Sequence, residues 1–242
     1  MRLLIIGCEY TGKQTLAAGI SQWMIRTMGV PYVRWHDHFV VPRLDGHMIV
    51  RGNDEAAVPG KDDADLNTAD DEAQILTLRP GVLEQLQRHM IWRHLHPDMY
   101  RDNDVLSINH YYADAVYAPI YHGYGESGTF SDRLQRAREW DNELLELAPD
   151  TVLVHMEADA QVIRHRMATT PARRGPLRHE DVPLVLRRFR EEFDQSLLHN
   201  KVILDTTNST ADQTLTRFLK EAEPYLSHVD RIRVLSGLGP PA

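Results

Sequence analysis

The chain has 242 residues, 42% of them hydrophobic, enough to bury one full core, so we expect a single domain over residues 1–235 and a frayed tail over 236–242. A formal net charge of −8 provides no basic surface for nucleic acid and favours a small-molecule substrate. The single cysteine, Cys8, excludes internal disulfides, and no apolar run reaches the length of a membrane span. We therefore expect a cytoplasmic protein without membrane contact; its oligomeric state stays open, a homodimer included.

The chain begins with an apolar run that predicts a strand, breaks at Gly7 into the pattern Gly-x4-Gly-Lys, and continues into a helical repeat of apolar residues. Gly7 and Gly12 permit backbone angles that a Cβ would block, so successive N–H groups can point at phosphate oxygens. Lys13 adds a positive charge, and the helix N-terminus lies under the same phosphates. An alternative is a plain glycine-rich turn with a surface lysine, but the chain uses 23 arginines and only four lysines. We therefore predict a phosphate-binding loop.

Residues 31–41 contain many β-branched and aromatic side chains and predict a second strand, with Asp37 at its carboxyl end. Ligands bind at that end in open parallel sheets, so we expect Asp37 to hold a water of a metal ion, or to act as base toward a hydroxyl acceptor. His36 and His38 would share a strand face, but two ligands without a third do not predict a transition-metal site. Residues 42–71 lose periodicity and predict a long inserted loop, either solvated or functional.

The remaining sequence alternates between helical and strand patterns. Helical spacing over residues 71–96 is interrupted at Pro80-Gly81, where we expect a kink or a split. Strands are predicted at 104–109, 151–156 and 201–204, and helices near 140–147, 160–167, 181–197 and 212–226. This alternation predicts a three-layer α/β/α protein in which helices cover both faces of a five-stranded parallel sheet. Together with the predicted phosphate-binding loop, it implies a phosphate-loop (P-loop) NTPase fold.

The order of parts resembles nucleoside monophosphate kinases of the thymidylate kinase type. Gly-Cys-Glu-Tyr-Thr-Gly-Lys, residues 7–13, is similar to that family's Gly-x-Asp/Glu-Gly-x-Gly-Lys, with Glu9 on the acidic position. Gln14 stands where most P-loops carry a Mg²⁺-ligating hydroxyl, and Thr15 follows; Gly-Lys-Gln-Thr resembles the Gly-Lys-Gly-Thr of adenylate kinases, where Mg²⁺ is held largely through waters. The resemblance implies ATP and Mg²⁺ as cofactors and a nucleotide site made by Gly7, Glu9, Thr11, Gly12, Lys13, Gln14, Thr15 and Arg164.

The third strand matches the thymidylate kinase pattern less closely. Where that family has Asp-Arg-Tyr, this chain has Asn109-His110-Tyr111, and a neutral His is a weaker phosphate ligand than a bidentate Arg. The resemblance implies acceptor contacts from Arg79, Asn109, His110, Tyr111, Asp114 and Tyr117. The tyrosines are expected either to stack on a base or to pack between helix and sheet with their hydroxyls near solvent.

Five arginines fall within 15 residues, around a segment too broken for a continuous helix: Arg164, Arg166, Arg173, Arg174 and Arg178. We predict a lid over residues 168–182 that closes on the triphosphate, excludes water and neutralises developing charge. Arg173 and Arg174 are the expected catalytic arginines, together with Lys13 and Asp37. The alternative is a solvated basic surface.

These features together predict ATP-dependent, Mg²⁺-requiring phosphoryl transfer to a small acceptor, a nucleoside monophosphate. The first alternative is a kinase of a hydroxyl acceptor such as a nucleoside. Such an acceptor carries no phosphate, so the enzyme does not need an arginine at the position of His110. A regulatory protein that binds ATP with little turnover is the second, and Gln14 and Asn109 favour it as lost metal-handling groups.

Overall fold

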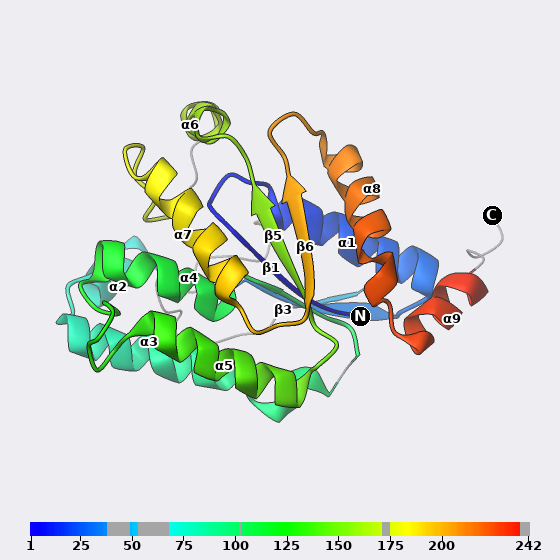
Figure 1. Ribbon diagram of the computed structural model, residues 1–242, viewed down its shortest axis with the longest axis horizontal. Coiled ribbons are helices and arrows are strands. Elements are labelled where there is room, and N and C mark those ends of the chain that lie inside the picture. Colours follow the sequence, from blue (N-terminus) through cyan, green and yellow to red (C-terminus); the bar gives the residue numbers. More distant parts are fainter. Residues whose placement is uncertain (38–48, 53–67, 102, 171–174, 238–242) are drawn as a thin grey trace.

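The computed structural model describes residues 1–37, 49–52, 68–101, 103–170 and 175–237. These residues form a six-stranded sheet in the order β3-β2-β4-β1-β5-β6 (Figure 1). The strands are β1 (Arg2–Gly7), β2 (Tyr32–Asp37), β3 (Ile49–Gly52), β4 (Val105–Ile108), β5 (Val152–Glu157) and β6 (Asn200–Asp205). Five of them are parallel, as predicted, and β3 runs antiparallel to β2.

Strand β3 lies within residues 42–71, so the prediction of a loop is wrong over these four residues. It pairs with β2 at the edge of the sheet, with Trp35 opposite Ile49. Four residues are too few to show a strand period in the sequence, and the open edge of β2 determines this strand instead. Residues 42–48 and 53–67 lie outside the described part of the chain.

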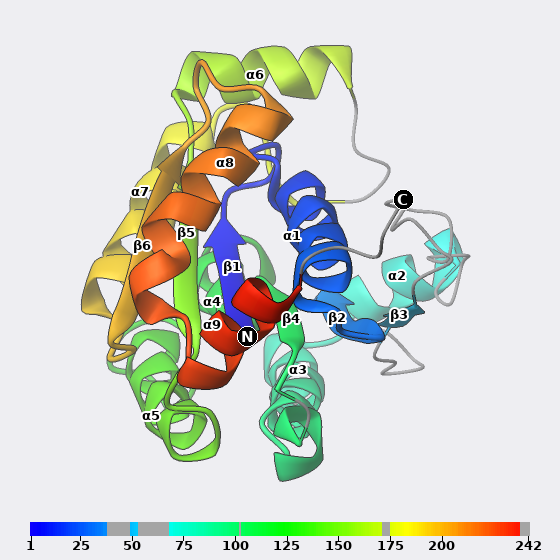
Figure 2. The ribbon, with the colours of Figure 1, turned by 90° about the vertical axis from the view of Figure 1, so that its right-hand side faces the viewer.

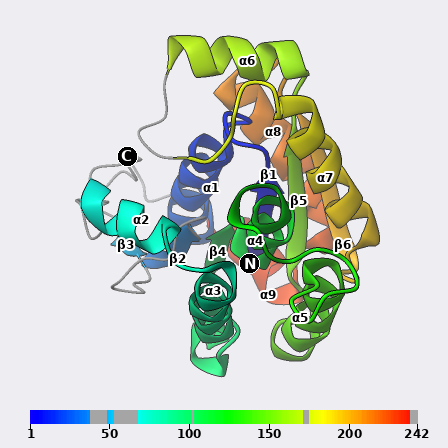
Figure 3. The same cartoon turned by 90° about the vertical axis from the view of Figure 1, so that its left-hand side faces the viewer.

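Helices cover both faces of the sheet. The described α-helices are α1 (Lys13–Met28), α2 (Ala69–Leu76), α3 (Pro80–His94), α4 (His110–Tyr117), α5 (Arg133–Leu147), α6 (Ala160–Thr169), α7 (Val182–Gln195), α8 (Ala211–Ala222) and α9 (His228–Ser236). Helices α1 and α8 cover one face, with α9 against α1, and α3, α4, α5 and α7 lie on the other (Figures 1 and 2). Figure 3 looks onto that second layer, with α4 surrounded by α3, α5 and α7. Among the described helices, none is long and apolar enough to cross a membrane.

The central strand β1 joins the two halves of the core. Successive side chains of a strand point to opposite faces, so Leu4 and Ile6 belong to the core under α4, α5 and α7, while Leu3 and Ile5 belong to the core under α1 and α8. All four side chains are at least 98% buried. Such two-sided burial explains why β1 reads as a continuous apolar run.

Turn chemistry determines where several helices begin and end. The predicted interruption of the 71–96 helix is confirmed: α2 begins one residue after Thr68, which caps it, and α3 begins at Pro80. The closing helix is shorter than predicted, because α8 ends at Ala222 and a short 3₁₀ turn (Glu223–Tyr225) follows. Helix α9 was not predicted; a capping box between Ser227 and Asp230 begins it. Residues 238–242, most of the predicted tail, lie outside the described residues.

Candidate functional site

The loop between β1 and α1 has the geometry that its two glycines allow. Gly7 has a φ of 146°, and a Cβ there would lie 2.3 Å from the carbonyl oxygen of Met156 in the neighbouring strand β5. Gly12 has a φ of 91° and directly precedes the first residue of α1. The Thr11 hydroxyl donates to the Cys8 carbonyl oxygen at 2.8 Å and closes the loop from inside. The chain therefore turns from strand to helix in a form that most other residues could not adopt.

The Lys13 ammonium lies inside this loop. Its Nζ donates to the carbonyl oxygens of Gly7 and Cys8, both at 2.7 Å, and the residue is only 8% exposed. Burial lowers the pKa of Lys13, while the nearby carboxylate of Glu9 opposes the shift. A cation held by two neutral carbonyls at a helix N-terminus is poised to bind an anion, because an anion supplies the negative charge that its present partners lack.

Three polar side chains meet at the carboxyl ends of β2 and β4. Gln14 Nε2 donates to Asp37 Oδ2 at 2.7 Å, and Asn109 Nδ2 donates to Asp37 Oδ1 at 3.5 Å. The parallel register of β2 and β4, with Asp37 opposite Ile108, brings Asp37 and Asn109 together. Thr15 is exposed one residue beyond Gln14. A carboxylate and a hydroxyl at one edge are oxygen ligands of the kind that suits hydrated Mg²⁺. Among the described residues, no group of three or more His, Cys, Asp or Glu could hold a metal ion directly.

Helix α4 connects this edge to the loop through Tyr117. The Tyr117 hydroxyl donates to Glu9 Oε2, and its ring packs edge-on against Phe189 of α7 at 5.6 Å between centroids. Burial raises the pKa of Glu9, and the charge of Lys13 opposes that shift. Of the predicted acceptor residues, Tyr117 is therefore in direct contact with the predicted phosphate loop.

His110 lies in a buried cluster of three imidazole rings that are tilted against one another. It is 1% exposed, and its ring centroid lies 5.5 Å from that of His94 on α3 and 4.8 Å from that of Tyr111. His94 in turn lies 4.0 Å from His36 on β2. His94 of α3 thus lies between His36 of β2 and His110 of α4, whereas His38 lies outside the described residues.

Tyr111 and Asp114 lie in the core and not beside the loop. The hydroxyls of Tyr111 and Tyr112 donate to Asp141 Oδ1 at 2.6 and 2.5 Å, so the expectation that these hydroxyls lie near solvent is wrong. Asp114 accepts from the Arg133 Nε at 2.5 Å and from the Tyr124 hydroxyl at 2.7 Å. Buried polar groups with such partners hold helices together, which gives these residues a structural role.

The predicted arginines are spread over several elements. Arg79 is exposed at the start of α3, and Arg164 donates from Nε to the His179 carbonyl oxygen at 3.2 Å. Arg173 and Arg174 lie outside the described residues.

Arg166, which the sequence presents only as one of five arginines, contacts the loop directly. It donates to the Tyr10 carbonyl oxygen at 2.9 Å and to the Thr206 carbonyl oxygen at 2.8 Å. Arg166 contacts the loop, whereas Arg164 contacts His179, because of the way α6 is oriented across the loop. No local sequence pattern encodes that orientation.

The segment before α7 also approaches the loop. The Tyr121 hydroxyl donates to Asp181 Oδ2 at 2.9 Å and accepts from the Arg178 backbone N–H at 3.3 Å. The Tyr121 ring lies parallel to that of Tyr117, with 6.0 Å between centroids. A Cβ placed on Gly175 would lie 3.5 Å from Glu9 Oε1. Helix α6, which precedes the predicted lid, therefore contacts the loop through Arg166, and the described lid residues 175–181 approach the loop at Gly175 and bind Tyr121.

Comparison with known proteins identifies the fold. No protein-family profile and no curated protein matches the sequence. The YorR protein from Bacillus subtilis, solved in complex with phosphorylated GDP, is similar over 93% of this chain and 99% of its own, with 17% identity and a TM-score of 0.52. Thymidylate kinase from Candida albicans matches over 92% of this chain and 91% of its own, with 15% identity and a TM-score of 0.48. The predicted α/β fold, a largely parallel sheet covered by helices on both faces, is confirmed, and this chain shares its fold with the YorR protein.

Proposed function

We propose that the protein transfers the γ-phosphoryl group of ATP to a small acceptor, a nucleoside monophosphate. The observation that carries this proposal is the buried Lys13 ammonium inside a loop formed by Gly7 and Gly12 at the N-terminus of α1. Loop N–H groups, the ammonium and the helix dipole act on one anion, the β- and γ-phosphates of ATP. Phosphoryl transfer depends chiefly on such positioning and charge neutralisation.

The residues around Asp37 fit a hydrated Mg²⁺ bound with the nucleotide. Asp37 would hold a metal water, with Thr15 on the phosphate side and Gln14 orienting the carboxylate through its hydrogen bond of 2.7 Å. When bound, Mg²⁺ neutralises phosphate charge and screens the approach of the acceptor.

The acceptor would lie between the loop and α3, beside the partly buried Asn109, with exposed Arg79 able to reach its phosphate. The buried Tyr117 and the His94–His110 pair would support the wall behind it. Arg164 and Arg166 of α6, with Arg173 and Arg174 of the lid, would surround the triphosphate of ATP.

A second candidate is a kinase of a hydroxyl acceptor, in which Asp37 is the base. The position of Asp37 favours it, because this carboxylate lies at the carboxyl edge of the sheet beside the loop, where an acceptor hydroxyl would approach the γ-phosphate. The two candidates differ in one property: the first requires a phosphate on the acceptor and the second does not.

A thermal-shift titration tests the proposal. ATP with Mg²⁺ at about 100 times its dissociation constant should stabilise the fold by about 2.7 kcal/mol, which raises Tm by roughly 5–10 °C for a chain of this size. Lys13→Ala should abolish the shift, and Lys220→Ala, an exposed lysine on α8, should not.

Coupled assays with monophosphates and with nucleosides then separate the two candidates. Unchanged ATP binding in Lys13→Ala, or ATP binding without transfer to any acceptor, would overturn the proposal. The second outcome would leave an ATP-binding regulatory protein.

A further inference from the structure

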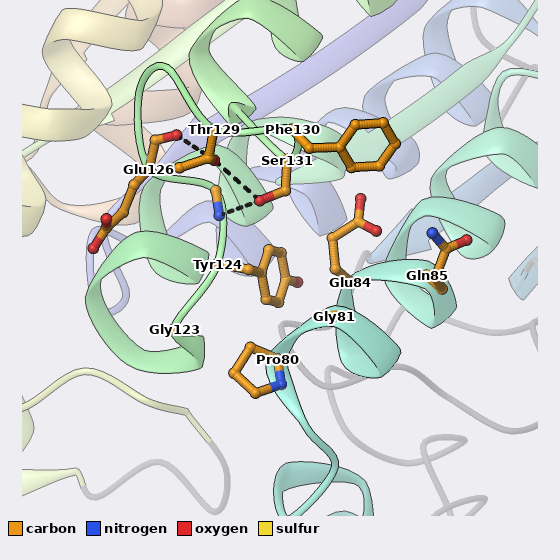
Figure 4. A pocket seen from close by; sticks show the side chains of 11 residues that line it. Pro80, Gly81, Glu84, Gln85, Gly123, Tyr124, Glu126, Thr129, Phe130 and Ser131 are labelled. Carbon is orange, nitrogen blue, oxygen red and sulfur yellow. Dashed lines mark hydrogen bonds between the residues drawn. The ribbon is translucent and has the colours of Figure 1, made fainter.

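A cavity of about 320 Å³ opens between the first turns of α3 and the segment that follows the π-helical turn η2 (Ala118–His122). Figure 4 shows side chains from both sides facing it, among them Pro80, Glu84, Tyr124, Phe130 and Ser131. Its volume lies at the lower end of the range for small-molecule sites, and its lining combines aromatic rings with a few polar groups.

The inner wall of the cavity is fixed by a buried ion-pair network. Arg133 is fully buried and donates to Asp114 Oδ2 at 2.5 Å and to Glu84 Oε1 at 3.0 Å. The Tyr124 hydroxyl donates to Asp114 Oδ1 at 2.7 Å, and the Arg133 guanidinium lies 5.0 Å from the Tyr124 ring centroid. These hydrogen bonds hold Glu84 and Tyr124 in fixed orientations at the cavity before any ligand binds, so the wall is preorganised.

Phe130 lies at the rim of the cavity and is 78% exposed. The loop that carries it is ordered by hydrogen bonds, from Gly125 N–H to Ser131 Oγ at 3.0 Å and from Gly128 N–H to Asp132 Oδ2 at 2.8 Å. An exposed phenyl ring on a structured loop beside a cavity is suited to stack on a flat heterocycle.

Glu84 supplies the polar selectivity of the cavity. Among the described residues its carboxylate accepts three hydrogen bonds, two from Arg88 (3.0 and 2.5 Å) and one from Arg133 (3.0 Å). A carboxylate has about four acceptor positions, so one remains on Oε2. The residue is 3% exposed and lines the cavity, which is where a donor could reach that position.

The cavity is linked to the phosphate loop through α4. Asp114, which holds Tyr124 and Arg133, is three residues before Tyr117, whose hydroxyl binds Glu9 of the loop. Residues three apart lie on the same side of a helix, with a rise of about 4.5 Å. Asp114 and Tyr117 are both buried, so α4 connects the cavity wall to the predicted phosphate loop through packed side chains one helical turn apart. This spacing suits an acceptor with its phosphate at the loop and its base in the cavity.

We infer that this cavity binds the base of the acceptor nucleotide and selects a base with an exocyclic amino group, such as cytosine, adenine or guanine. The inference rests on the proposed function. An amino group projects from the ring and can donate to Glu84, as acidic side chains accept from the cytosine amino group. In thymine and uracil the ring N–H lies between two carbonyl oxygens, which would face the carboxylate and repel it.

Calorimetry with monophosphates of the five bases tests the inference, with a non-hydrolysable ATP analogue bound. The amino-bearing nucleotides should bind at least about tenfold more tightly than the thymine and uracil nucleotides. Phe130→Ala should weaken them by about tenfold and leave the affinity for the ATP analogue unchanged. Trp92→Ala is the matched control, because Trp92 is a 58% exposed aromatic residue on α3 that does not line the cavity.

Equal affinity for all five bases, or unchanged binding in Phe130→Ala, would overturn the inference. Glu84→Gln should reduce the preference for amino-bearing bases, but it weakens the ion pairs with Arg88 and Arg133. Phe130 therefore carries the test, because its side chain is exposed and, although its ring lies 5.4 Å from the Arg88 guanidinium, it takes no part in those ion pairs. Calorimetry reads binding without turnover. A protein that binds cytidine monophosphate through Phe130 but transfers no phosphoryl group would contradict the proposed function and leave this inference standing.

Discussion

The two ends of the sheet differ in how their charged side chains are paired and in their backbone conformation. At the carboxyl end, the hydrogen-bond acceptors of Lys13 within the described part of the chain are two carbonyl oxygens. The three non-glycine residues with positive φ in the described part of the chain, Tyr10, Asn109 and His110, also lie there. At the amino end, Arg233 of α9 donates to both carboxylate oxygens of Asp104, at 2.8 and 3.0 Å. Backbone strain and a cation that pairs with no carboxylate of the described residues lie where we place the ligand, and paired charges lie at the opposite end of the sheet.

Lys13→Met should have the largest effect on activity and should show most clearly that the carboxyl end of the sheet serves function. Catalytic efficiency should fall by about 10²–10³-fold, because the transition state loses a preorganised positive charge. The free energy of unfolding should change by less than about 1 kcal/mol, since the methionine also removes a buried charge whose desolvation opposes folding. Steady-state kinetics and urea unfolding measure the two quantities. A large loss of stability would show that Lys13 is a structural residue.

Arg233→Ala should give the opposite result at the amino end. Removing the hydrogen bonds to Asp104 and Asp230 should destabilise the fold by about 2 kcal/mol, because hydrogen bonds to charged groups are the strong ones. Catalytic efficiency should stay within about twofold of the unaltered protein once unfolding is corrected for. Arg187→Ala is the control, because that arginine is exposed on α7 and its pair with Glu191 should contribute less than about 0.5 kcal/mol.

The sequence predicted the loop at the carboxyl end well, because its information is local. Gly7, Gly12 and Lys13 lie in one motif, and the flanking strand and helix patterns supply the context that the motif requires. Asp37 and Asn109 could also be placed, since carboxyl ends of parallel strands meet at one edge.

The contacts that the sequence did not predict are nonlocal. Asp114 was expected at the acceptor site, but Arg133 pairs with it from another helix. Arg166 contacts the loop across more than 150 residues, and its role depends on how α6 is oriented. Strand β3 depends on the edge of β2, whereas the Ser227–Asp230 capping box that begins α9 is a local feature of the sequence.

Tyr121→Phe tests whether the arm before α7 is coupled to the loop. The change keeps the ring beside Tyr117 but removes the hydrogen bonds to Asp181 and to the Arg178 N–H. We expect the KM for ATP to rise about fivefold, which corresponds to a loss of about 1 kcal/mol in binding free energy. ATP hydrolysis in the absence of acceptor should increase, because the arm excludes water less well. Tyr225→Phe is the control, because its hydroxyl bonds the Lys201 carbonyl oxygen, far along the chain from the loop. Equal changes in both variants would remove the case for coupling.

Tyr10 gives the smallest expected effect and the sharpest test of backbone strain at the carboxyl end. Its φ is 64°, in the left-handed region, at the position where the resembling kinases have glycine. Tyr10→Gly relieves the strain and loses the packing of a half-buried ring, whereas Tyr10→Ala loses the same packing without relief. The glycine variant should therefore be more stable than the alanine variant by about 1 kcal/mol, the reverse of the order found inside a helix. Urea unfolding of the two variants measures the difference. An alanine variant of equal or greater stability would show that the left-handed turn at Tyr10 costs nothing, and that the contrast between the two ends of the sheet is one of charge alone.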